Sequence, residues 1–154
     1  MKGEEIHRDL LIAIGNYSRG DDALGWLFAD HVAQLGLDIK IEYRYQLQVE
    51  DAELLQYFDR VIFTDASKVT YPSGFHFYPI HAAMDYTFTT HSVSAGTLLQ
   101  LASELYHSTP EAHMMAVSGT AWGLGKMPGK TGKDNLRKAL SFFEQNWLPC
   151  VDSP

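Results

Sequence analysis

Residues 10–25, LLIAIGNYSRGDDALG, carry the clearest signal for the fold. The five apolar residues LLIAI run without a polar break into Gly15, a pattern typical of a strand buried on both faces of a parallel sheet. Apolar residues then recur at helical spacing at Leu24, Leu27, Phe28, Val32 and Leu35, and Gly36 follows where such a helix would end. The stretch therefore predicts a buried parallel strand that passes through an acidic turn into a helix.

The same alternation continues along the chain. Strands are predicted at 39–45, 60–65 and 114–119, with a weaker strand signal at 75–80. Helices are predicted at 51–58, after an N-cap at Ser94, and from about Lys133 onward. No repeat or linker interrupts this order. We therefore expect one α/β domain over residues 1–154, with its core at about 10–147 between short tails, built as three α/β/α layers around a mostly parallel, mixed and twisted sheet.

Composition excludes several function classes. The chain has 154 residues and a formal charge of −7, which argues against nucleic acid as a partner. No apolar run is long enough for a membrane span, and the start MKGEEIHRDL does not resemble a signal peptide. A single cysteine, Cys150, fits a reducing compartment, so we expect a cytoplasmic protein. The basic segment 126–138 is either a solvated face or a contact for an acidic partner.

Acidic and histidine side chains fall where predicted strands end. Asp21 and Asp22 follow the first strand, Asp65 ends the strand VIFTD, and His91 precedes a later helix. Ligands of open α/β sheets collect beyond the carboxyl ends of the strands, so these groups are expected at one edge. Asp21 is predicted to cap the first helix by accepting a hydrogen bond from the Leu24 amide, which leaves Asp22 to point into the crevice.

Two carboxylates and one imidazole around one point suit a divalent transition metal with open coordination positions. From the residues alone a simpler interpretation stays open, in which the acids cap helices or turns and His91 lies in a polar loop. Spacing across three separated segments does not decide between the two.

Three stretches in this order resemble the hydrogenase maturation proteases, the endopeptidases that trim the C-terminal extension from the large subunit of nickel–iron hydrogenases. They are GNYSRGDDALG (15–25), VIFTDAS (61–67) and THSVSAGTLLQLASELY (90–106). The resemblance spans about residues 10–146. It implies an endopeptidase whose partner is a hydrogenase large-subunit precursor, cut at one peptide bond after nickel insertion.

The resemblance also implies roles for residues. By motif, the metal-binding and catalytic positions fall on Asp22, Asp65 and His91, and the substrate-binding turn after the first strand falls on Gly15 and Asn16. Nickel would be carried by the precursor, and the free enzyme would bind it weakly or not at all. Two departures stand out: YQLQVEDAE replaces the Asp-Gly-Gly-Thr that many members carry, and alanine at position 23 replaces a frequent glycine.

Two other classes compete with the protease interpretation. GLGKMPGKT, residues 123–131, resembles a nucleotide-binding P-loop, but Leu124 stands where the first glycine of that motif is required. A serine or cysteine hydrolase would use Ser18, Ser92, Ser94 or Cys150, yet no G-x-S-x-G elbow surrounds any of them. Binding of an ATP analogue and sensitivity to covalent inhibitors would reveal these alternatives.

Overall fold

The computed structural model describes residues 8–84 and 93–147. In these ranges five strands form one sheet in the order β2-β1-β3-β5-β4. Their bounds are β1 (Asp9–Ile14), β2 (Ile39–Arg44), β3 (Arg60–Ser67), β4 (Phe75–Pro79) and β5 (Glu111–Ser118). All neighbouring pairs are parallel except the β4–β5 pair, which is antiparallel. The predicted α/β class with a mostly parallel, mixed sheet is confirmed.

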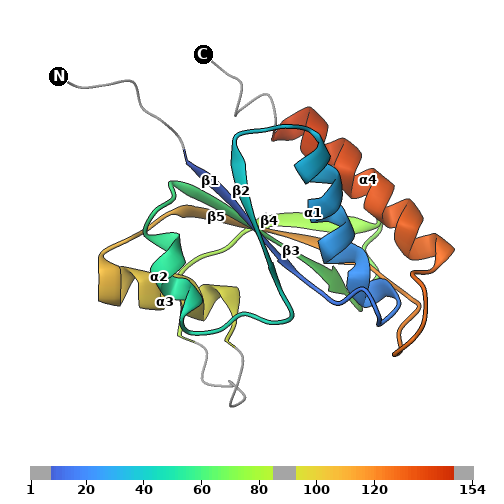
Figure 1. Ribbon diagram of the computed structural model, residues 1–154, viewed down its shortest axis with the longest axis horizontal. Coiled ribbons are helices and arrows are strands. Elements are labelled where there is room, and N and C mark those ends of the chain that lie inside the picture. Colours follow the sequence, from blue (N-terminus) through green and yellow to red (C-terminus); the bar gives the residue numbers. More distant parts are fainter. Residues whose placement is uncertain (1–7, 85–92, 148–154) are drawn as a thin grey trace.

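Helices cover both faces of the sheet, which gives the expected three layers (Figure 1). Their bounds are α1 (Leu24–Gln34), α2 (Asp51–Leu55), α3 (Ala95–Tyr106) and α4 (Lys130–Asn146). α1 and α4 lie on one face, and α2 and α3 lie on the other (Figure 1). Within the described ranges, no helix has the length and apolar character that crossing a bilayer would require.

The strand β1 lies between the two cores, as its uninterrupted apolar run predicts. Leu11 and Ala13 pack in the core beneath α1 and α4. Leu10 and Ile12 pack in the opposite core, with α2 and α3. Because successive side chains of a strand point to opposite faces, both faces of β1 must be apolar.

Several boundaries differ from those predicted. β3 runs on to Ser67, so Asp65 lies inside the strand and not at its end. The extension is stabilised by pairing of residues 65–67 with 116–118 of β5, a partner that local sequence does not reveal. For the same reason β5 begins at Glu111 and not at 114. α4 begins earlier than predicted, at Lys130, and α2 ends earlier, at Leu55.

The N-terminus of α1 packs against the backbone at the carboxyl edge of the sheet. A Cβ added at Gly25 would meet the carbonyl oxygen of Ile14 and would lie 2.9 Å from that of Thr64 and 3.2 Å from Cα of Asp65. Only glycine fits between the ends of β1 and β3 here. This contact brings the turn before α1, which holds Asp21 and Asp22, next to Asp65.

Candidate functional site

The turn after β1 supports Asp22 through its backbone. The Asn16 N–H donates to the carbonyl oxygen of Asp22 at 3.0 Å, and a Cβ at Gly15 would lie 2.5 Å from that same oxygen. The Asn16 side-chain oxygen accepts from the Ser18 N–H at 2.9 Å and from the Ser18 hydroxyl at 2.7 Å. Gly15 and Asn16 therefore shape the turn that presents Asp22.

Asp21 does not cap α1, contrary to the prediction. Its carboxylate is fully buried and accepts three backbone hydrogen bonds, from Thr120 at 2.6 Å, Ala121 at 2.8 Å and Gly129 at 2.8 Å. No side chain caps α1 or the short 3-10 helix η1 (Asp21–Ala23) before it. The donors lie in the segment between β5 and α4, so tertiary contacts take the carboxylate away from the helix end.

One of these hydrogen bonds argues against the nucleotide-binding alternative. A P-loop cradles phosphate with the backbone amides that precede its helix. Here Gly129, which directly precedes α4, donates its N–H to the carboxylate of Asp21 at 2.8 Å. This amide of the P-loop-like segment is therefore already bound to an acidic side chain of the protein itself.

Asp22 and Asp65 lie close enough to interact electrostatically. Burial, followed by the negative charge of Asp22, raises the pKa of Asp65 from 3.8 to about 7. Burial also raises the pKa of Asp22, while the positive charges of Arg19 and Lys68 lower it. Two neighbouring carboxylates with different surroundings are typical of sites that bind a cation or move protons.

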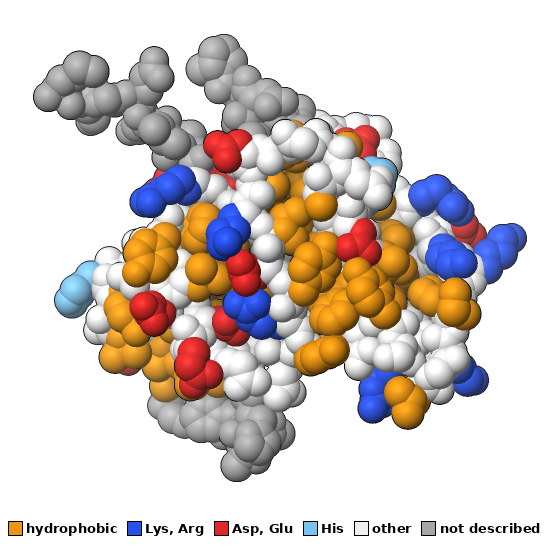
Figure 2. All heavy atoms as spheres, viewed as in Figure 1, with side chains coloured by type: hydrophobic (Ala, Val, Ile, Leu, Met, Phe, Trp, Pro, Cys, Tyr) orange, Lys and Arg blue, Asp and Glu red, His pale blue; other side chains and the backbone are white. Residues whose placement is uncertain are grey.

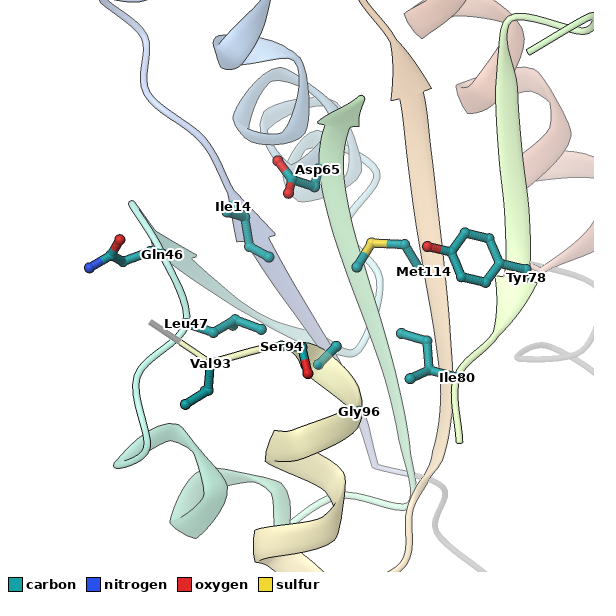
Figure 3. A pocket seen from close by; sticks show the side chains of 11 residues that line it. Ile14, Gln46, Leu47, Asp65, Tyr78, Ile80, Val93, Ser94, Gly96 and Met114 are labelled. Carbon is teal, nitrogen blue, oxygen red and sulfur yellow. The ribbon is translucent and has the colours of Figure 1, made fainter. Parts of the chain in front are cut away.

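A pocket of about 410 Å³ opens beside Asp65 (Figure 3). Its wall is formed by β3, β5, the ends of β1 and β4, the β2–α2 connection and the start of α3. The lining residues are Ile14, Gln46, Leu47, Asp65, Tyr78, Ile80, Val93, Ser94, Ala95, Gly96 and Met114. A mostly apolar cavity next to a carboxylate suits an apolar side chain of a larger ligand.

The third predicted ligand, His91, lies outside the described residues, as do Ser92 and Cys150. The chain is described again from Val93, and Val93 and Ser94 line the pocket. Ser94 caps α3 as predicted, since its hydroxyl accepts from the Thr97 N–H at 3.1 Å. Among residues 8–84 and 93–147, no three histidine, cysteine or acidic side chains form a group that could hold a metal ion.

Sequence reasoning missed the residues of the apolar pocket wall. Tyr78 and Ile80 belong to the edge strand β4 and its continuation, and Met114 lies on β5. Met114 is the register partner of Phe63 on β3, two residues before Asp65. The alternation of strand side chains would have placed Met114 on the face of Phe63, once the order of the strands was known.

No known family profile and no curated protein matches the chain. Several solved structures do match it over most of its length. A [NiFe] hydrogenase maturation protease HycI from Thermococcus kodakarensis KOD1 is 20% identical over 90% of each chain, with a TM-score of 0.69. The hydrogenase maturating endopeptidase HybD from E. coli is 18% identical. The match covers 90% of this chain and 94% of that protein, with a TM-score of 0.65.

A hydrogenase 2 maturation peptidase from a Thaumarchaeota archaeon is 18% identical, covers 92% of this chain and 99% of its own, and also gives a TM-score of 0.65. The likeness spans nearly the whole of each chain. At this level of identity it establishes a shared fold.

Proposed function

We propose that this protein is an endopeptidase that acts in the cytoplasm on the large-subunit precursor of a nickel–iron hydrogenase, removing its C-terminal extension after nickel insertion. One observation carries the proposal: the fold brings Asp22 and Asp65 together at one sheet edge, beside an apolar pocket. The solved structures that share the fold are named as proteases of this kind.

Nickel belongs to the substrate in this proposal, and Asp22, Asp65 and His91 are its contacts. Burial, and after it the negative charge of the neighbouring Asp22, raises the pKa of Asp65 toward neutrality. A divalent cation carried by the precursor would neutralise both carboxylates and would displace the proton from Asp65. The site therefore favours a precursor that contains nickel over one that lacks it.

The apolar pocket would hold a side chain of the tail. Because Asp65 forms part of the pocket wall, a side chain seated there belongs to the residues next to the bound nickel. Gly15 and Asn16 would contribute by holding the backbone of Asp22 in place. Positioning of this kind is a large part of catalysis by any peptidase.

The direct test is processing of purified precursor with and without nickel. We expect the wild type to release a tail fragment, detected by intact-mass spectrometry, only from the nickel-loaded form. Asp22→Asn, Asp65→Asn and His91→Ala should each slow this cleavage at least about tenfold, since even outer contacts of metal sites contribute that much. Asp38→Asn makes the same chemical change on an exposed side chain and should cleave normally. Equal cleavage of nickel-free precursor would rule out nickel as the recognition element.

A further inference from the structure

A cationic surface with apolar residues at its tip lies beside the candidate site. We call it the basic surface, and its members are Leu124, Lys126, Met127, Lys130, Lys133, Arg137 and Lys138. All seven are exposed, and the two apolar side chains are exposed to 70% and 78% respectively. Figure 2 shows Lys and Arg side chains gathered over the N-terminal half of α4 and the loop before it.

The charge of this surface is opposite to that of the whole protein. It holds five of the 12 Lys and Arg residues of a chain whose formal charge is −7. Asp134, the only acidic residue between 119 and 138, pairs with Arg137. In the described part of the chain, no ion pair involves Lys126, Lys130, Lys133 or Lys138. These four charges are therefore available to an acidic partner.

Backbone hydrogen bonds join the loop of the basic surface to the segment that precedes Asp22. Gly20 donates its N–H to the Lys126 carbonyl oxygen at 2.9 Å, and Gly125 donates to that of Ser18 at 2.6 Å. The buried carboxylate of Asp21 holds the two ends of the same loop through its three hydrogen bonds. A partner docked on this surface would thus be held in a fixed position relative to Asp22.

Lys68, which follows β3, connects the loop to the strand that carries Asp65. Its ammonium group lies 5.5 Å from the ring centroid of Trp122 in the loop, a cation–π contact. Asp65 lies three residues before it on the chain. The loop is therefore connected both to the turn that carries Asp22 and to the end of β3, the strand that carries Asp65.

We propose that the basic surface docks the folded part of the precursor through an acidic face of it that includes apolar side chains. The proposal rests on the proposed function, because it assigns the surface to the protein whose tail enters the site. Exposed Met and Leu side chains supply contact area, and unpaired lysines steer an acidic partner and favour it over others. Recognition would then involve the precursor body as well as its nickel and tail.

The test compares two double charge reversals with equal net change. Lys130→Glu with Lys133→Glu reverses the basic surface, and acids in the first turn of α4 suit the helix dipole, so folding is preserved. Arg8→Glu with Lys40→Glu reverses two exposed charges at the start of β1 and β2, at the opposite end of the sheet. Each pair changes the formal charge by −4, and circular dichroism melting verifies that both variants are folded.

Affinity is measured by surface plasmon resonance against the nickel-loaded precursor and against the mature subunit without its tail. We expect reversal of the basic surface to lower the affinity for both about tenfold or more at low salt, mainly through slower association. The control pair should leave the affinity for both ligands unchanged. In cleavage assays the same reversal should raise KM and leave kcat unchanged.

The apolar half of the surface is tested separately. Leu124→Gln with Met127→Gln should speed dissociation from both ligands without lowering the melting temperature, because both side chains are exposed. Equal affinity of the reversal and control variants would overturn the docking surface while leaving cleavage intact. Loss of affinity by the reversal, with no cleavage by the wild type, would uphold docking and overturn the proposed function. Binding of RNA or anionic vesicles through these lysines, with precursor affinity unchanged, would also overturn the docking proposal.

Discussion

Replacing Asp65 by asparagine should make the protein more stable at neutral and alkaline pH. The substitution keeps the shape of the side chain and removes its charge. Burial and the charge of Asp22 raise the pKa of Asp65 from 3.8 to about 7, so the folded wild type binds a proton that the unfolded chain releases. The wild type therefore loses stability as the pH rises from about 4 through 7, and the loss is complete above the pKa of the folded state.

The size of the effect follows from the shift of the pKa. A shift of about three units corresponds to about 4 kcal/mol, since each unit contributes about 1.4 kcal/mol. Part of that difference is already present at pH 5, because an unfolded aspartate is mostly ionised there. Between pH 5 and pH 8 the advantage of Asp65→Asn over the wild type should therefore grow by about 2–3 kcal/mol.

The assay is urea unfolding followed by tryptophan fluorescence at several pH values between 5 and 8, without nickel. Asp38→Asn, an identical change on an exposed side chain, should remain within about 0.5 kcal/mol of the wild type throughout. Equal stability of Asp65→Asn and wild type at every pH, or a less stable variant at pH 8, would show that the Asp65 carboxyl is not held protonated by the fold. A more stable variant that no longer cuts precursor is the signature of a functional site that is kept at a cost in stability.

Three further outcomes follow from the packing around the site. Asp21→Ala should destabilise the fold by about 3–5 kcal/mol in urea unfolding, because three backbone N–H groups lose a buried charged acceptor; Asp21→Asn, which keeps an acceptor oxygen, should lose less. Gly25→Ala should cost about 1–3 kcal/mol and slow cleavage, since its Cβ would press on the backbone of Ile14 and Asp65. Ile80→Trp should fill part of the pocket and raise KM for precursor with little change in melting temperature, whereas an unchanged KM would remove the pocket from the substrate path.

Local sequence determined the elements and their order. The run from Leu10 to Ile14 predicts a strand buried on two faces, because alternate side chains of an apolar strand must both find cover. Gly36 adopts a positive φ of 68° just after α1, and Ser94 caps α3, as their types predict. These features depend on contacts within a few residues, which is the range over which side-chain chemistry acts on its own backbone.

Predicted strand ends and the resemblance of motifs also identified candidate site residues from the sequence. The sequence placed Asp22 after the first strand and Asp65 at the end of a later one, both at one edge of the sheet, and the two do interact electrostatically. It did not determine the extension of β3 past Asp65, because that depends on pairing with β5, about fifty residues further along the chain. Nor did it reveal the pocket, whose wall comes from six separate parts of the chain.

Asp21 shows most clearly what local sequence cannot predict. An aspartate just before a helix is a good N-cap by every local criterion, yet its partners lie 99, 100 and 108 residues away. A buried carboxylate gains more from three backbone donors than from one helix-end amide that water can reach. Only the tertiary structure brings those donors to Asp21, and with them the loop that carries Leu124, Lys126 and Met127 to the side of the candidate site.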